Sequence, residues 1–357
     1  MRIFSPVAAG ALVLLASAIP APDAAAFCRT TTCSLPPSWS PGPDGCVPPT
    51  FVQDCAMRTP PVSVFPLFWR NACVGYDIQK NASKWVTLAD AQTIVAEAFA
   101  QWTGGGDSGT AARATCPADS AGQTSVGLQA QYEGAVDCGH PGYNKDGAPN
   151  QHVIIFHDDV WPYDAASTNT ATTLASTLGL TTVTFDVNTG EIYDADTEIN
   201  GTVPLSADDP VPAGGFDLRS IITHEMGHFL GLAHSGDATA TMYAQYSPGS
   251  TSMRSVMADD VAGICSIYLP DGTRSVDPSV GAGGSIRADA CDPTPRHGWS
   301  SECDQAPAQS GCAVHSSGTT DGGGRWGEAA VLLLTTVSVL RMRRRGRTAW
   351  NPGDFRR

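Results

Sequence analysis

The stretch from His224 to Ser235 reads HEMGHFLGLAHS, and it constrains the fold more than any other part of the 357-residue chain. His224 and His228 are four residues apart, so on a helix they share one face and can bind a single metal ion. Gly231 ends this helix and lets the chain turn back, so that His234 supplies a third imidazole. Three neutral nitrogens with one open coordination position are typical of a catalytic zinc site rather than a structural one.

Glu225 follows the first histidine, where its carboxylate can reach a water bound to the metal. Zinc lowers the pKa of its bound water from ~16 to ~7, and Glu225 would take the water proton and pass it to a leaving amine. Asp217 is the expected N-cap of the helix. Apolar residues at three- and four-residue steps predict a buried helix face: Leu218, Ile221, Ile222, Met226, Phe229 and Leu230. A helix with scattered surface histidines, the alternative, leaves the spacing of Gly231 and His234 unexplained.

This stretch resembles the metzincin zinc endopeptidases and, within them, the matrixins. Ser235 directly follows the third histidine, and matrixins have the same residue at this position. Thr241–Met242–Tyr243 resembles the Met-turn, whose methionine lies beneath the zinc. Tyr246 resembles the tyrosine that helps to wall the specificity pocket, although Ala244 stands where matrixins usually have proline. Ser220 lies one helical turn before His224, and its small side chain predicts a roomy pocket for a large apolar residue after the scissile bond.

The resemblance implies an α+β domain at about residues 62–270, with a twisted, mixed and mostly parallel sheet, three helices and a zinc cleft. Leu88–Trp102 resembles the first matrixin helix, and Met257–Pro270 resembles the closing helix, with its paired Asp259 and Asp260. Short strands are expected at 74–78 and 153–156.

Thr182–Asp186 and Glu191–Asn200 read as a hairpin. Its second strand carries three alternating carboxylates on one face: Asp194, Asp196 and Glu198. This face either binds a hard cation such as calcium or is a polar strand face in an acidic protein. The resemblance places the same strand at the edge of the cleft, where an extended peptide could pair with it.

The run from His157 to Ala165 resembles the matrixin loop that binds a second, structural zinc and a calcium. The resemblance would assign His157 and Asp159 to zinc and Asp164 to calcium. The two other structural histidines have no counterpart, and half a ligand set rarely holds zinc. A solvated acidic loop is the alternative.

The N-terminus is typical of a secretory signal peptide over residues 1–26, with cleavage expected before Phe27. We therefore expect secretion through the Sec pathway and disulfides among the eleven cysteines. Residues 27–61 are rich in Cys and Pro, and we expect disulfides to join them to the catalytic domain. The formal net charge of −14 argues against nucleic acid as a partner.

Residues 271–325 are rich in Gly, Ser and Pro and read as a flexible linker. Residues 326–347 read as a short hydrophobic helix with an arginine cluster, the only expected membrane contact. This end resembles the sorting tails of myxobacterial surface proteins, with Cys312 at the processing position and the cell surface as the destination. An ordinary single-pass anchor is the alternative.

The combined expectation is a monomeric, secreted or surface-tethered zinc metalloendopeptidase that acts on extracellular proteins or peptides. Matrixins usually carry a propeptide whose cysteine, within a PRCG-type motif, blocks the zinc. This sequence contains no such motif. Two alternatives stay open. One is a catalytically silent metal-binding adhesion module, and the other is a zinc hydrolase that cleaves small non-peptide amides.

Overall fold

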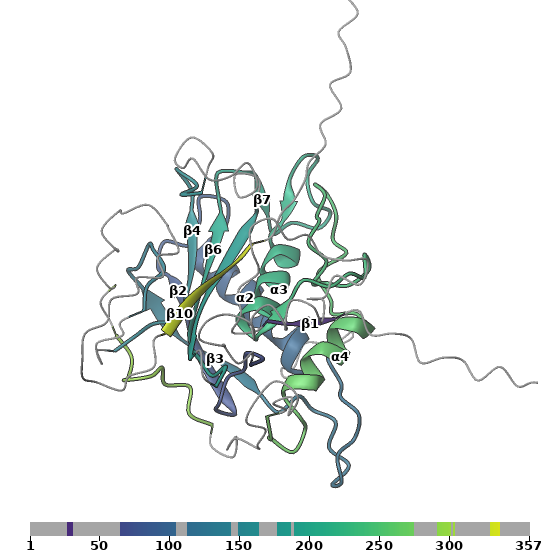
Figure 1. The fold of residues 1–357 in the computed structure, drawn as a ribbon. Coiled ribbons are helices and arrows are strands. Elements are labelled where there is room, and N and C mark those ends of the chain that lie inside the picture. The colour runs from purple at the N-terminus through teal and green to yellow at the C-terminus, as the bar shows by residue number, and fades with distance from the viewer. Residues whose placement is uncertain are drawn as a thin grey trace, which may run out of the picture.

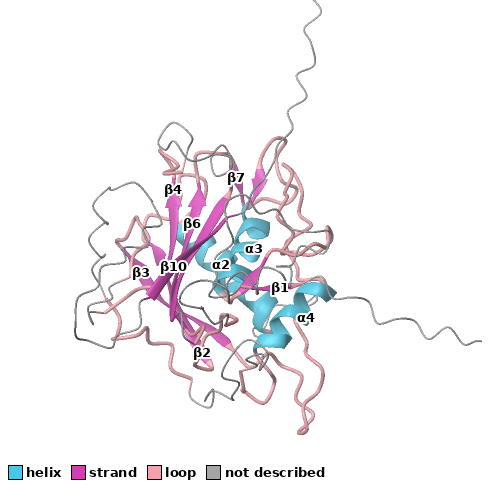
Figure 2. Ribbon diagram, in the orientation of Figure 1, coloured by secondary structure: helices cyan, strands magenta, loops and turns pink. Residues whose placement is uncertain are grey.

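The computed structural model describes residues 27–30, 65–104, 113–143, 149–163, 177–186, 189–274, 291–300, 303 and 329–335. A mixed sheet forms one layer, and two packed helices cover one of its faces, as Figures 1 and 2 show. The architecture is α+β, as expected. The predicted signal peptide and Cys312 lie outside the described residues, as does most of 27–61.

The sheet has the strand order β10-β5-β6-β4-β2-β3. Its strands are β2 (Cys73–Gln79), β3 (Gln129–Val136), β4 (Val153–His157), β5 (Gly179–Asp186), β6 (Ile192–Asn200) and β10 (Ala329–Thr335). The four strands from β6 to β3 are parallel, whereas β5 and β10 are antiparallel to their neighbours. The expectation of a mixed, mostly parallel sheet is confirmed.

The predicted position of β6 at the cleft edge is wrong. β6 lies between β4 and β5, so both of its edges are hydrogen-bonded within the sheet. An extended peptide therefore cannot pair with residues 194–200. The strand outside β6 is β5, whose N-terminal end lies at the predicted catalytic helix.

All three predicted helices are present in the described part of the chain: α2 (Leu88–Thr103), α3 (Leu218–Phe229) and α4 (Ala258–Ile267). The N-cap of α2 is Thr87, whose side chain forms a capping box with Asp90, and its C-cap is Gly104, which has a φ of 71°. α2 packs on α3, and the Trp102 indole donates a hydrogen bond to the Thr223 carbonyl oxygen at 2.7 Å. This contact fixes α3, which carries His224 and His228, against α2.

The expectation of a free linker from residue 271 is wrong in part. Disulfides tie Cys291 to Cys73 and Cys303 to Cys138, and a third joins Cys116 to Cys265. The Trp299 ring fills the space beside Gly75, where a Cβ atom would collide with it. Residues 291–300 and Cys303 therefore belong to the domain, because the two disulfides and this aromatic contact fix them to the sheet.

Within the expected C-terminal helix, the described residues Ala329–Thr335 form a strand instead, drawn in yellow in Figure 1. This strand, β10, pairs with β5 from Ala329 opposite Asp186 to Thr335 opposite Leu180. An apolar run of this length satisfies its backbone by joining an available sheet edge. Among the described residues, no helix is long and apolar enough to cross a membrane.

Candidate metal centre and cleft

Helix α3 positions the first two histidines of the motif. Its N-cap is Asp217, as predicted, and the Asp217 carboxylate accepts a hydrogen bond from the Ser220 backbone N–H at 3.0 Å. His224 and His228 lie one turn apart, and their ring centroids are 4.9 Å apart. Both side chains are buried, so the helix presents them to the interior of the cleft rather than to bulk water.

The chain turns sharply after α3 and brings the third histidine to the other two. Gly231 has a φ of 97°, and a Cβ atom there would lie 2.9 Å from the Leu67 carbonyl oxygen, so glycine is required. The turn leads into β9 (Leu232–Ala233) and then His234, whose Nε2 atom is 3.2 Å from Nε2 of His228. Ligand atoms of His224, His228 and His234 all lie within 4.8 Å of one another. The predicted three-histidine cluster is therefore assembled.

Backbone carbonyls orient the helical rings. His224 Nδ1 donates to the Thr241 carbonyl oxygen at 2.6 Å, and His228 Nδ1 donates to the Leu232 carbonyl oxygen at 2.9 Å. The proton on Nδ1 leaves Nε2 with a free lone pair, as a metal ligand requires. His224 Nε2 is buried and has no hydrogen-bond partner in the described structure, which fits a metal ligand.

Burial keeps the three imidazoles neutral. Desolvation lowers the pKa of His224 to about 4 and that of His234 to about 3. Desolvation, reinforced by the two neighbouring rings, also lowers the pKa of His228 well below its ordinary value. Neutral imidazole is the form that coordinates zinc, so this cluster suits a divalent metal ion at neutral pH.

Glu225 lies under the beginning of β5. The Thr181 hydroxyl donates a hydrogen bond to Glu225 Oε2 at 2.8 Å, and a Cβ atom at Gly179 would lie 2.6 Å from Oε1. Glu225 is fully buried, and it lines the same hollow as His224. Gly179 therefore leaves room for the carboxylate, and Thr181 fixes its direction.

Met242 packs directly beneath the helix that carries the histidines. A Cβ atom at Gly227 would collide with the Met242 sulfur. The Asp260 carboxylate accepts hydrogen bonds from the backbone N–H groups of Thr241 at 2.7 Å and Met242 at 3.0 Å. The predicted hydrophobic floor is present, and α4 holds it in place.

The hollow beside the histidines is apolar and small. Its lining residues are Leu178, Ile221, His224, Glu225, Tyr243, Ala244, Tyr246 and Met253. The free space is about 20 Å³, little more than one water molecule occupies. Tyr246 lines the hollow as predicted, but Ser220 does not, because its hydroxyl donates to the Asp217 carboxylate at 2.7 Å. The expectation of a roomy pocket is therefore wrong.

The acidic face of β6 is buried, but the contacts of its carboxylates are within the protein. Asp196 accepts hydrogen bonds from the backbone N–H groups of Val153 and Gly142, both at 2.8 Å. Glu198 accepts from Tyr163 at 2.6 Å and lies 2.7 Å from His157 Nε2. Among the described residues, the three β6 carboxylates do not form a metal-ligand cluster. Predicted Asp164 lies outside the described residues.

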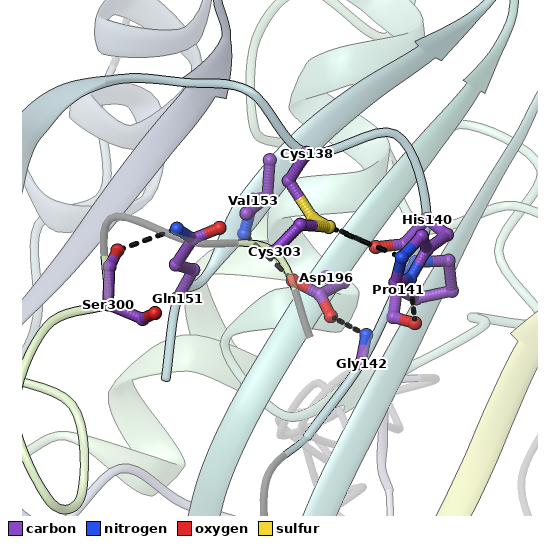
Figure 3. The surroundings of a disulfide bond; sticks show 9 residues. All are labelled: Cys138, His140, Pro141, Gly142, Gln151, Val153, Asp196, Ser300 and Cys303. Atoms are coloured by element: carbon purple, nitrogen blue, oxygen red, sulfur yellow. Dashed lines mark hydrogen bonds between the residues drawn. A yellow bond between two sulfur atoms is a disulfide. The ribbon is translucent and has the colours of Figure 1, made fainter. Parts of the chain in front are cut away.

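Among the described residues, His157 and Asp159 do not belong to a cluster of metal ligands. His157 turns toward Glu198, whereas Asp159 is exposed in the following loop. The other candidate cluster in the described structure consists of Cys138, His140 and Cys303 (Figure 3). Its two sulfurs form a disulfide, with His140 Nε2 at 3.3 Å from Cys303 Sγ, so they are not free thiolate ligands.

The sequence does not predict the supporting positions of Gly179 and Thr181, or the supporting role of Asp260. Gly179 and Thr181 are far from the motif in sequence, so no local spacing connects them to Glu225. The only sequence signal for Asp260 is the acidic pair that it forms with Asp259.

Comparison with known proteins finds related sequences over this region. Residues 106–269 match the family model described as Matrixin. The chain is 29% identical over 131 residues to Metalloendoproteinase 1-MMP of Arabidopsis thaliana, which covers 37% of this chain and 32% of that protein. It is 43% identical over 79 residues to Matrix metalloproteinase-27 of Tupaia belangeri, covering 22% and 15%. It is 45% identical over 56 residues to Neutrophil collagenase of Homo sapiens, covering 16% and 12%. The chain thus spans a third or less of the length of these relatives.

Proposed function

Because residues 106–269 match the matrixin family, we propose that this chain is a zinc-dependent endopeptidase. His224, His228 and His234 would hold the zinc through Nε2. The observation that carries the proposal is the convergence of three neutral imidazoles beside a buried glutamate in one apolar hollow. When bound there, zinc acts as a Lewis acid on the scissile carbonyl and lowers the pKa of water.

Glu225 is the proposed general base and acid. It takes a proton from the attacking water, whose oxygen adds to the scissile carbonyl carbon, and it passes the proton to the leaving amine nitrogen as the C–N bond breaks. The Thr181 hydroxyl, at 2.8 Å from Oε2, would hold one carboxylate oxygen in place during these transfers. The Asp260 carboxylate accepts a hydrogen bond from the Met242 backbone N–H and would thereby keep Met242 beneath α3.

We propose that an extended peptide substrate pairs with the outer edge of β5. The N-terminal end of this strand adjoins Glu225, so a paired peptide would run toward the histidines. β10 holds this edge in the structure, so a substrate would have to take its place. The small apolar hollow would admit only a small side chain after the scissile bond.

We also propose that the enzyme works outside the cytoplasm, on extracellular proteins or peptides, as a monomer. Three disulfides in the described structure favour an oxidising compartment. The signal-like N-terminus points the same way.

The test compares the secreted wild-type chain with Glu225→Gln and with the matched control Glu133→Gln, which changes an exposed glutamate on β3. Zinc content and cleavage of an unfolded protein such as reduced casein are measured. We expect one zinc per chain in all three proteins, a 10²- to 10⁴-fold loss of cleavage in Glu225→Gln only, and full loss in chelator.

Two outcomes would contradict the proposal. Undiminished cleavage by Glu225→Gln would contradict the role of Glu225 as the general base. Stoichiometric zinc without cleavage of any protein by the wild type would instead support the metal-binding adhesion module.

A further inference from the structure

A cavity of about 370 Å³ lies at the N-terminal ends of three parallel strands. Its lining includes Val74 at the start of β2, His152 just before β4, and Tyr193 near the start of β6. The volume is in the range of small-molecule binding sites. None of its lining residues also lines the hollow beside the three histidines, so the cavity is separate from the candidate metal centre.

The outer wall of the cavity is formed by residues 292–296. The disulfide between Cys73 and Cys291 fixes the start of this wall to β2. The Gly75 backbone N–H donates a hydrogen bond to the Pro293 carbonyl oxygen at 3.0 Å, so the wall also contacts the strand directly. The wall is therefore a fixed part of the domain, and it lies outside the residues that match the matrixin family.

His152 is buried, and one of its ring nitrogens makes no hydrogen bond in the described structure. Burial lowers the pKa of His152 to about 4, and Nδ1 donates to the Gly75 carbonyl oxygen at 2.9 Å, so Nε2 of the neutral ring is an acceptor. Asp194 Oδ1 lies 3.8 Å from Nε2 and the Tyr193 backbone is nearby, but their oxygens are acceptors too. A buried acceptor that lacks a donor costs free energy. A ligand ammonium group would supply the donor and would also meet the negative charge of Asp194.

Two arginines bring positive charge to the same cavity. The Arg296 guanidinium carbon lies 4.0 Å from the centroid of the Tyr193 ring, and Arg70 Nη1 lies 3.8 Å from Glu191 Oε2. Burial raises the pKa of Glu191 whereas both arginines lower it, so the two positive charges lie near this one carboxylate. A guanidinium stacked on an aromatic ring can still offer its N–H edge to a second carboxylate in bidentate geometry.

Tyr193 connects the two kinds of group, because its ring lies under Arg296 and its backbone lies beside His152 Nε2. One small molecule with an ammonium group and a carboxylate can therefore reach both. Trp69 and Ile192 add apolar surface to the lining. We propose that this cavity binds a free α-amino acid with an apolar side chain, with its ammonium group on His152 Nε2 and its carboxylate on Arg296. This binding site is independent of the proposed peptidase activity.

Calorimetric titration of the full secreted chain tests the proposal with three probes. L-leucine has both charged groups, L-leucinamide lacks the carboxylate, and Nα-acetyl-L-leucine lacks the ammonium group. Each probe is titrated into the wild type, Arg296→Gln and the matched control Arg113→Gln, which changes an arginine that does not line the cavity. Because amino acids can also bind zinc, each titration is repeated after treatment with chelator. The nitrogen NMR signal of His152 Nε2 reports on the ammonium end.

We expect one leucine to bind per chain, with the same affinity before and after treatment with chelator. Leucinamide and Nα-acetyl-leucine should bind about tenfold or more weakly, because each loses a hydrogen bond between charged or buried groups. Arg296→Gln should weaken the binding of leucine by a similar factor and leave that of leucinamide unchanged, whereas Arg113→Gln should bind all three like the wild type. The His152 Nε2 signal should shift with leucine and leucinamide but not with Nα-acetyl-leucine.

The absence of saturable leucine binding would overturn the inference, as would equal affinities for the three probes or an affinity unchanged in Arg296→Gln. Loss of binding after treatment with chelator would also overturn it, because the leucine would then have been bound at the metal. Protein cleavage separates this result from the proposed function. If leucine binds as expected but no protein is cleaved, the endopeptidase proposal fails and the amino-acid site stands.

Discussion

The Met242 sulfur occupies the space where a side chain on Gly227 would begin. Gly227 lies between the two helical histidines, so the floor of the site touches the backbone of the helix directly. The spacing of the motif therefore includes a steric requirement in addition to the positions of its ligands. The loop that carries Met242 can pack against α3 only while residue 227 has no side chain.

Gly227→Ala tests this contact. The new methyl group would collide with Met242 and lie 2.8 Å from Trp102 Cζ2, so we expect a loss of about 1–3 kcal/mol in the free energy of unfolding and weaker zinc binding. Urea unfolding and chelator competition measure both effects. Gly134→Ala is the control, because its Cβ atom would meet nothing closer than 3.7 Å. The double variant Gly227→Ala/Met242→Ala should recover part of the loss; no recovery would show that Met242 is not the obstacle.

Thr181→Val removes the hydroxyl that donates to Glu225 while keeping the shape of the side chain. We expect kcat to fall by about tenfold or more, because the base loses its orientation, with zinc content unchanged. Thr181→Ser should restore most of kcat. Thr184→Val, at another buried position on β5, is the control. An unchanged kcat in Thr181→Val would contradict a positioning role for this hydroxyl.

Met253→Ala enlarges the apolar hollow beside the histidines. We expect the variant to gain about tenfold in kcat/KM for peptides with an aromatic residue after the scissile bond, relative to a small residue there. A peptide library shows the shift, and Met257→Ala, at an exposed position, serves as the control. An unchanged preference would mean that this hollow does not receive that residue.

His152 makes the fold sensitive to acid at a place away from the candidate metal centre. Desolvation lowers its folded pKa to about 4, although Nδ1 donates to the Gly75 carbonyl oxygen at 2.9 Å and Nε2 lies 3.8 Å from Asp194. The unfolded chain binds this proton near pH 6.5. Between about pH 6.5 and 4 the unfolded state therefore holds more protons than the folded state. As the pH falls through this range, His152 lowers the free energy of unfolding by up to about 1.4 kcal/mol for each pH unit.

Urea unfolding of chelator-treated protein between pH 7.5 and 4.5 measures this slope. His152→Asn keeps a donor near Gly75 but does not titrate, so its slope should be shallower than that of the wild type. His297→Asn, at an exposed position, should leave the slope unchanged. Equal slopes for the wild type and His152→Asn would show that His152 is not buried in its neutral form.

The sequence predicted the parts of the site that depend on local spacing. His224 and His228 follow from helical periodicity, His234 from the turn at Gly231, and the helix start from the capping tendency of Asp217. Each of these residues is close in sequence to the others, so the backbone geometry of one helix and one turn determines how they meet.

Features that depend on distant contacts were predicted less well. The interior position of β6 depends on β5 lying outside it, and the period-two pattern of carboxylates does not reveal strand order. The segment around Cys291 and Cys303 has a linker-like composition, but the disulfides of these two residues with distant cysteines fix them to the sheet. Ser220 was assigned to the pocket from helical spacing alone, whereas its hydrogen bond to Asp217 turns it toward the helix start.

X-ray absorption at the zinc edge of the purified secreted chain tests the central claim most directly. We predict three imidazole nitrogens at about 2.0–2.1 Å and one oxygen from water, with one nitrogen lost in His234→Ala. A sulfur ligand at about 2.3 Å, or a spectrum unchanged by His234→Ala, would contradict a zinc centre built by His224, His228 and His234.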